Sequence, residues 1–357
     1  MKRAFLFSGQ GSQAAGMSGA LAASCEDCLR KLAQSRPAHG LAGGALPPLA
    51  AGTAMVCPEC QATFQLADRT LGYPLSVVMA HGSPEELRRT EIQQPMILSL
   101  TVAEAYRLIA QGLVPDALAG HSLGQYAALV VAGAIEFEKA VRLVAARGRL
   151  MQRTVPDGKG AMMAIMGLDR QTIYDACVSV RSIGIVGVAL HNSPGQTVIS
   201  GERPAVLAAA DRCEEEGGGA VEVPVSVPFH CDLLAPMAPT FARLVDAAGI
   251  RDPKLPVIDN VTARPLTDAD SVRESLVLQL THPVLFEESL DYLVNTGVDH
   301  FIQCGPGKSL LSFVQRVSRT AITETFEMAS SSRARPRSTA STTDRKAFED
   351  GHVATAA

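Results

Sequence analysis

The chain has 357 residues, of which 47% are hydrophobic and 19% are charged, and its formal net charge at pH 7 is −4. This length is sufficient for one large or two modest domains. The small acidic excess disfavours a nucleic-acid-binding protein. No apolar run reaches the roughly 18 residues that cross a membrane, and the run at residues 4–7 is too short for a signal peptide. We therefore expect a cytoplasmic protein whose eight cysteines are reduced thiols.

Short apolar runs and helical patterns alternate along the first half of the chain. Residues 3–7 predict a buried strand that GQGSQ at 9–13 interrupts. Further along, apolar residues at helical spacing predict one more strand, at 117–119, and five helices, at 58–73, 84–90, 95–110, 123–131 and 137–152. Such alternation is typical of an α/β layer architecture with a mostly parallel sheet.

The segment 158–228 has a different pattern. Its strands are predicted at 160–168, 185–190, 196–201 and 220–227, and its helices at 170–181 and 204–217. The order βαββαβ is that of a split-βαβ, ferredoxin-like unit. Because α/β signals resume afterwards, we interpret this unit as an insertion. Helices are predicted again at 232–248, 271–280, 286–296 and up to about 318, and strands at 256–258 and 300–303.

The predicted fold class is therefore α/β, with an α/β-hydrolase-like parallel-sheet core and an inserted ferredoxin-like subdomain. The predicted domains are a large catalytic part (1–157 and 229–328) and a small part (158–228). Residues 329–357 are polar, with few large apolar side chains, and such a composition predicts a disordered tail.

The pentapeptide GHSLG at 120–124 stands where the predicted strand would turn into a helix. This G-x-S-x-G pattern is typical of a nucleophile elbow, a sharp turn that lifts a serine above the sheet. The N–H of Leu123 would then be an oxyanion donor at the start of a helix. The alternative is a tight turn that happens to contain a serine, but the strand-turn-helix context favours a catalytic Ser122.

A serine nucleophile needs a base, and we favour His230 among the eight histidines. It follows the strand predicted at 220–227, and sites in α/β proteins form at strand ends. His121 adjoins the serine, but neighbours on such a turn rarely face each other. A purely structural role for His230 remains the alternative.

Several motifs in a fixed order now point to one family. They are GQGSQ at 9–13, GHSLGQ around Ser122, VSVPFHC at 225–231 and CGPGKSL at 304–310. Together they resemble the malonyl-CoA:acyl carrier protein transacylases and the related acyltransferase domains of polyketide synthases. The resemblance covers residues 1–24 and about 57–328.

The resemblance implies a role for five residues in acyl transfer. Ser122 would attack the thioester of malonyl-CoA to form a malonyl-serine ester. His230 would be the general base and then the acid, and the main-chain carbonyl of Gln279 would orient its imidazole, a variant of the serine-triad arrangement. The oxyanion would be bound by the N–H groups of Gln10 and Leu123, each worth about 3 kcal/mol of transition-state stabilisation.

Four further residues match the substrate cleft of the family. Arg147 would hold the malonyl carboxylate, since a guanidinium binds a carboxylate through two parallel hydrogen bonds; without the resemblance it would be a solvated helix arginine. Phe229 would crowd the space that an α-methyl group needs and so favour malonyl, an effect of about 1–3 kcal/mol. Gln94 and Asn192 would line the cleft, or only cap backbone in turns.

The chain departs from the family pattern at two motif positions. Ser8 stands before GQGSQ, where proline is frequent, and Gln125 ends GHSLGQ, where an acidic residue is common. Neither change touches the proposed proton path, although both could shift the local rigidity.

Residues 25–56 form an insert that is atypical of the family, and two C-x-x-C pairs bracket it, at 25/28 and 57/60. Four thiolates can bind zinc tetrahedrally, but the pairs are separated by more residues than in a usual zinc ribbon. We favour a thiol-bearing loop and predict no metal. The other cysteines read as buried small apolar residues: Cys177, Cys213, Cys231 and Cys304.

The resemblance implies a ping-pong reaction that moves malonyl from CoA to the phosphopantetheine thiol of an acyl carrier protein, for fatty acid or polyketide synthesis. We expect a monomer without cofactor. Basic side chains at the cleft mouth would steer an acidic carrier: Arg153, Lys159 and Lys308. The alternatives are a serine hydrolase that removes acyl groups from carrier proteins, and a non-catalytic docking module.

Overall fold

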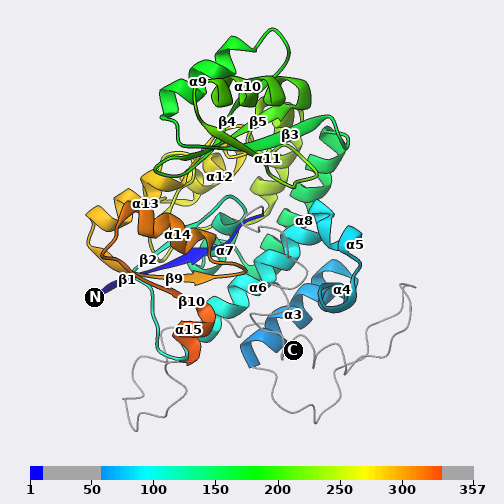
Figure 1. The fold of residues 1–357 in the computed structure, drawn as a ribbon. Helices are drawn as coiled ribbons and strands as arrows, with labels where there is room; N and C mark the ends of the chain where they lie inside the picture. Colours follow the sequence, from blue (N-terminus) through cyan, green and yellow to red (C-terminus); the bar gives the residue numbers. More distant parts are fainter. Residues whose placement is uncertain (11–57, 332–357) are drawn as a thin grey trace.

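A computed structural model describes residues 1–10 and 58–331 of the chain. The insert at 25–56 with its first C-x-x-C pair, Cys57 of the second pair, and most of the predicted tail therefore lie outside the described residues. Within these ranges no helix combines the length and apolarity needed to cross a bilayer. The structure has two separate five-stranded sheets (Figure 1).

The first sheet is parallel, with the strand order β10-β9-β1-β2-β7. Its strands are β1 (Lys2–Phe7), β2 (Ala117–Gly120), β7 (Val257–Ile258), β9 (Val298–Cys304) and β10 (Ile322–Thr325). The inner strands β1 and β2 are mostly apolar and buried, as expected of a parallel sheet covered on both faces, whereas the edge strand β10 (ITET) is largely polar.

Helices cover this sheet on two sides (Figure 1). Successive side chains of a strand point to opposite faces. On one face of β1, Phe5 and Phe7 belong to the core that includes α6 (Thr90–Ala110) and α7 (Gly124–Val131). On the other face, Ala4 and Leu6 belong to the core that includes α13 (Phe286–Asn295) and α14 (Ser309–Val317). The other helices of the large part are α3 (Pro58–Leu71), α4 (Leu75–His81), α5 (Pro84–Arg88), α8 (Phe137–Thr154), α11 (Ala238–Ala247), α12 (Ala269–Leu278) and α15 (Phe326–Ser331).

The second sheet has the order β6-β3-β5-β4-β8. Its first four strands are β3 (Gly160–Met166), β4 (Val186–Ser193), β5 (Gln196–Glu202) and β6 (Gly219–Glu222), and they alternate with α9 (Arg170–Ser179) and α10 (Arg203–Glu215). All pairings among these four strands are antiparallel. The order of elements along the chain, βαββαβ, and the strand order β6-β3-β5-β4 in the sheet are those of a ferredoxin-like unit, which confirms the prediction.

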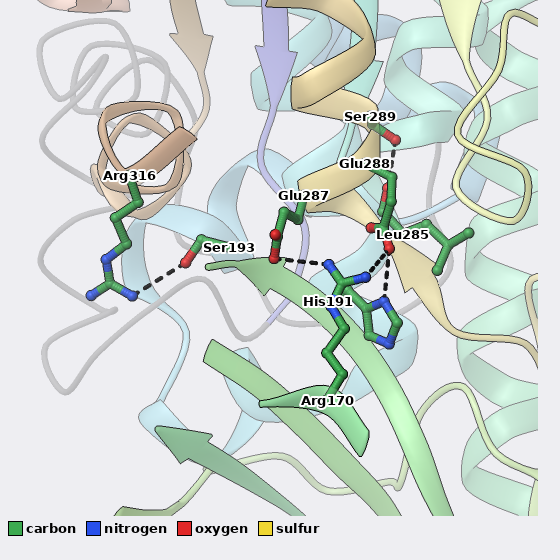
Figure 2. Close-up of polar contacts among 8 residues, drawn as sticks. All are labelled: Arg170, His191, Ser193, Leu285, Glu287, Glu288, Ser289 and Arg316. Carbon is green, nitrogen blue, oxygen red and sulfur yellow. Dashed lines mark hydrogen bonds and ion pairs between the residues drawn. The ribbon is translucent and has the colours of Figure 1, made fainter. Parts of the chain in front are cut away.

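A fifth strand, β8 (Val284–Leu285), pairs in parallel with β4 although it lies beyond the predicted end of the small part at residue 228. Side chains extend this link between the parts. Arg170 and His191 of the second sheet region contact Glu287 and Glu288 of α13, and Arg316 of α14 donates to Ser193 (Figure 2). We call the first four of these residues the Glu288 cluster. The exact boundaries of the two predicted domains stay a prediction.

The structure corrects the predicted strand at 220–227, because β6 ends at Glu222. Val223 still donates to the Met162 carbonyl at 2.9 Å, but Pro224 has no N–H with which to continue the ladder. The predicted helix at 232–248 begins instead as a 3-10 helix, Asp232–Met237, before α11.

The first three residues of the predicted tail, 329–331, belong to a helix, because α15 runs to Ser331. Phe326 packs against α6 with the Arg107 guanidinium 5.7 Å from its ring centroid, and Ala329 is buried. Contacts with α6 thus hold the first residues of the predicted tail in a helix.

Candidate active site

Ser122 lies on the sharp turn between β2 and α7, with a φ of 52°. Residues other than glycine rarely adopt this left-handed region, and such strain clusters at functional sites. The flanking glycines have no room for a side chain. A Cβ on Gly120 would lie 1.9 Å from the carbonyl carbon of Gly124, and a Cβ on Gly124 would lie 2.0 Å from the Phe7 oxygen. The two glycines therefore let the turn close on itself and on β1.

His230 faces this serine from a distant segment. Its Nε2 lies 2.7 Å from Ser122 Oγ, and its Nδ1 lies 2.7 Å from the main-chain oxygen of Gln279. Like Ser122, His230 has a positive φ, 58°. The predicted position of His230 at a strand end is wrong, because the residue lies in the loop well beyond the end of β6. The structure nevertheless brings together the predicted nucleophile Ser122, the predicted base His230 and the Gln279 carbonyl predicted to orient it.

The environment of His230 keeps its imidazole neutral. Burial, and then the positive charge of Arg147, lower the pKa of His230 from 6.5 to about 3, although the hydrogen bond to Gln279 opposes this shift. At neutral pH, Nδ1–H donates to the Gln279 carbonyl and Nε2 is free to accept from Ser122 Oγ–H. This is the protonation state that a general base requires.

Arg147 of α8 is 1% exposed, so the solvated alternative for this residue is wrong. Its Nη1 donates to Gln94 Oε1 at 3.2 Å and its Nη2 to Gln279 Oε1 at 3.1 Å. The guanidinium lies 5.4 Å from the ring centroid of Tyr126, and burial lowers its pKa. Among residues 1–10 and 58–331 it forms no ion pair with a carboxylate, and its Nε has no hydrogen-bond partner. A buried cation of this kind is suited to an anionic ligand.

The other predicted cleft residues lie beside these groups. Gln94 contacts Arg147 directly and is buried. Phe229 is 6% exposed, and its ring centroid lies 6.5 Å from that of His230. Asn192 of β4 does not cap its turn. Its Oδ1 lies 2.8 Å from Nε2 of His121, whose ring packs edge-on against Phe286.

The two predicted oxyanion donors come from neighbouring strand ends. Gln10 follows β1 and Leu123 precedes α7, and the pairing of Phe7 with Gly120 places the two segments side by side. Within the described part of the chain, neither of the two N–H groups donates a hydrogen bond. The side chain of Gln10 is held by Gln93, with Nε2 and Oε1 2.5 Å apart.

Sequence reasoning missed the buried polar groups behind the serine, namely Asp259, Asn260 and Ser275. Asp259 and Asn260 directly follow β7, which is the neighbour of β2 in the sheet. Because sites of α/β proteins form at the carboxyl ends of parallel strands, the pattern VIDN after a short predicted strand was the available signal.

The cysteines fall into two groups. The four that were predicted to be buried are free and buried: Cys177, Cys213, Cys231 and Cys304. Burial raises the pKa of Cys231 to about 11, so the neighbour of His230 is an inert thiol. In the part of the chain that the structure describes, no three metal-binding side chains gather at one place. The zinc hypothesis needs Cys25, Cys28 and Cys57, which lie outside that part, and so it stays untested.

Comparison with known proteins agrees with this geometry. The family described as "Acyl transferase domain" matches residues 53–349. The malonyl CoA-acyl carrier protein transacylase of Escherichia coli K12 is 39% identical over 320 residues, which span 89% of this chain and 93% of that protein. The enzyme of the same name from Bacillus subtilis is 41% identical over 280 residues, 76% of this chain and 88% of that protein.

Solved structures agree as well. The malonyl CoA-acyl carrier protein transacylase from Coxiella burnetii has a TM-score of 0.79 and 37% identity, covering 93% of this chain and 96% of that one. A malonyl-transacylase in complex with its type II PKS acyl-carrier protein has a TM-score of 0.77 and 36% identity, covering 91% and 95%. The chain therefore belongs to the acyl transferase family, and within it to the malonyl CoA-acyl carrier protein transacylases.

Proposed function

We propose that this protein transfers the malonyl group of malonyl-CoA to the phosphopantetheine thiol of an acyl carrier protein, through a malonyl ester on Ser122. The observation that carries the proposal is the 2.7 Å contact between Ser122 Oγ and His230 Nε2 beside a buried Arg147 without a carboxylate partner among the described residues. The first gives an activated nucleophile, and the second gives a site for the malonyl carboxylate. The named relatives and the carrier complex of a related enzyme support the same reaction.

In the first half-reaction, Ser122 Oγ attacks the thioester carbonyl while His230 Nε2 takes its proton. The oxyanion is stabilised by the N–H groups of Gln10 and Leu123. The C–S bond then breaks, and His230 returns the proton to the leaving CoA sulfur. Arg147 holds the distal carboxylate throughout, so the acyl group is positioned for attack.

The second half-reaction reverses these roles with a new thiol. His230 takes the proton of the phosphopantetheine thiol, the sulfur attacks the ester carbonyl, and the C–O bond to Ser122 breaks. The serine oxygen recovers the proton from His230. The neutral imidazole that burial enforces is the form that both half-reactions require at their start.

The finer parts of the proposal concern selectivity and partners. Phe229 favours malonyl over methylmalonyl without excluding it. Arg153, Lys159 and Lys308 are exposed and are suited to an acidic carrier. Charge reversal at these three positions should slow transfer to the carrier while leaving acylation of Ser122 by malonyl-CoA unchanged. Equal loss in both steps would contradict their role.

We also propose that the enzyme acts as a monomer, without a metal or an organic cofactor. Light scattering of the purified protein tests the first point. Activity after dialysis against a chelator tests the second. The cytoplasmic location stays a prediction, which cell fractionation would test.

Intact-mass measurement tests the main proposal. Purified protein is exposed to malonyl-, methylmalonyl- or acetyl-CoA without carrier. We expect a stable malonyl adduct on the wild type, a weaker methylmalonyl adduct and little acetyl adduct. Rapid release of free malonate without an adduct would favour the hydrolase alternative, and no reaction at all would favour the docking module.

A further inference from the structure

Gln279 contacts all three central residues of the site. Its main-chain oxygen accepts from His230, its side-chain oxygen accepts from Arg147, and its Nε2 donates to the Ser122 carbonyl at 3.1 Å. The residue is fully buried. Whatever orients the Gln279 amide therefore orients the nucleophile, the base and the carboxylate-binding group together.

Two neighbours orient that amide. Gln279 Nε2 donates to Asn260 Oδ1 at 2.9 Å and faces Gln125 Oε1 at 3.4 Å. Gln125 Oε1 also accepts from the N–H of Asn260 at 2.8 Å. Both contacts require Gln125 to present its carbonyl oxygen, not its NH₂ group, toward Gln279.

The opposite end of Gln125 explains why it takes this orientation. Its Nε2 donates to Ser275 Oγ at 2.8 Å and to Asp259 Oδ1 at 3.3 Å, and the Ser275 hydroxyl in turn donates to the same Asp259 oxygen. The second oxygen of Asp259 accepts from the N–H and the hydroxyl of Thr262 at 3.0 and 2.8 Å. Every group around this buried carboxylate is a donor, so only the NH₂ end of Gln125 fits beside it.

We propose that Gln125 and Asp259 form a positioning pair that orients Gln279, and through it Ser122, His230 and Arg147. The pair requires one amide and one carboxyl group. The common family motif GHSLGE has a glutamate where this chain has Gln125. In this chain, Asp259 supplies the carboxyl group of the pair. This inference rests on the proposed function for its catalytic meaning but not for its geometry.

The chemistry of the pair predicts that the single exchange is harmful and the double exchange is tolerated. Gln125→Glu would place two carboxylates about 3 Å apart in a buried site, where they repel each other and the pKa of one carboxyl rises above its ordinary range. Gln125→Glu with Asp259→Asn restores one acid and one amide, because the new carboxylate at position 125 then accepts from the new amide at position 259. Two other charged or titratable residues of the described part are connected to this pair by hydrogen bonds. They are Arg147 and His230, and each is connected through Gln279.

The test measures labelling of Ser122 by a fluorophosphonate, which reports the activated serine whatever the acyl donor is. At pH 8 we expect Gln125→Glu to react about tenfold more slowly than the wild type or worse, and the double variant to recover to within about threefold. The deficit of Gln125→Glu should shrink as the pH falls to 6, because one of its two carboxyls then holds a proton and again donates to the other. Neither the wild type nor the double variant should show this gain.

The matched control is Gln171→Glu. Gln171 also donates to an aspartate, Asp175 Oδ1 at 2.9 Å, but on the exposed surface of α9, so this variant should react at the wild-type rate. The proposal is overturned if Gln125→Glu reacts like the wild type, or if the double variant is no faster than Gln125→Glu. Should Gln125→Glu fail to fold, the double variant is compared with Asp259→Asn, and a slower double variant overturns the pair. A wild type that the fluorophosphonate labels but malonyl-CoA does not acylate would contradict the proposed function and leave this result valid.

Discussion

Two polar clusters join distant segments of this chain, and they differ in their exposure to water. Around Ser122, the side chains are buried, and Arg147 is 1% exposed. In the Glu288 cluster, which links the two sheets, the side chains of Arg170 and Glu288 are 41% and 30% exposed (Figure 2). Charges in the second cluster are paired and partly screened by solvent.

The difference separates a functional arrangement from a structural one. The buried cluster contains two residues in a strained backbone conformation, Ser122 and His230, and a cation without an acidic partner among the described residues. In the exposed cluster, partial burial alone would raise the pKa of Glu288, but the hydrogen bond of His191 and the charge of Arg170 hold it below its ordinary value. Backbone strain and unpaired buried charge cost stability and cluster at functional sites. Mutations in the buried cluster, and not in the Glu288 cluster, should therefore change the rate of acyl transfer.

The largest expected effect follows from removing the nucleophile. Ser122→Ala should abolish the malonyl adduct and lower transfer by about 10⁴-fold or more, because no other group forms the ester. Intact mass and carrier malonylation measure both. Ser312→Ala is the control, since Ser312 is exposed and bonds only its own helix. A malonyl adduct on Ser122→Ala would place the nucleophile elsewhere.

Removing the buried cation should have the next largest effect. Arg147→Ala should lower the rate of malonylation by a factor corresponding to about 2–5 kcal/mol, because the substrate carboxylate then enters a dry site without a partner. Acylation by acetyl-CoA should fall much less. The control is Arg142→Ala, on the exposed face of the same helix. Equal losses with both acyl donors would assign Arg147 a structural role.

Acid should destabilise the protein through His230. The pKa of His230 is about 3 in the folded protein, below its ordinary 6.5, so the unfolded chain takes up a proton first as the pH falls. Stability is therefore unaffected by this group above pH 6.5 and declines from about pH 6.5 toward pH 3, by on the order of a few kcal/mol. Urea unfolding at several pH values should show a smaller decline in His230→Gln than in the wild type. Identical slopes would mean that His230 is not held neutral.

The exposed cluster should give the smallest effect. Glu288→Gln weakens the contacts with Arg170 and His191, and we expect a loss below about 1 kcal/mol, or a few degrees in Tm, with unchanged acylation. Thermal unfolding at low and high salt measures it. A loss of acylation comparable with that of Arg147→Ala would show that the contact between the two sheets also controls the site.

Most of the fold could be predicted because the signals are local. The apolar run in β1, the helical spacing in α8 and the G-x-S-x-G turn each depend on residues close together in the chain. The short strands β8 and β10 were missed, although the equally short β2 and β7 were predicted. β2 and β7 are fully buried and therefore apolar, whereas β8 and β10 are only partly buried and are defined by their partner strands and not by their own pattern. The start of α6 was also misplaced: the helix predicted at 95–110 begins at Thr90 and carries Pro95 inside it.

The sequence by itself determined the elbow, the order of the elements and which residues carry reactive groups, because steric demands of a turn and apolar periodicity are short-range properties. Only the tertiary structure decided that His230 meets Ser122, that Arg147 is buried without a carboxylate among the described residues, and that Gln125 is oriented by Asp259. These arrangements join segments more than 100 residues apart. Their protonation and orientation follow from desolvation, which depends on everything packed around them and on no local pattern.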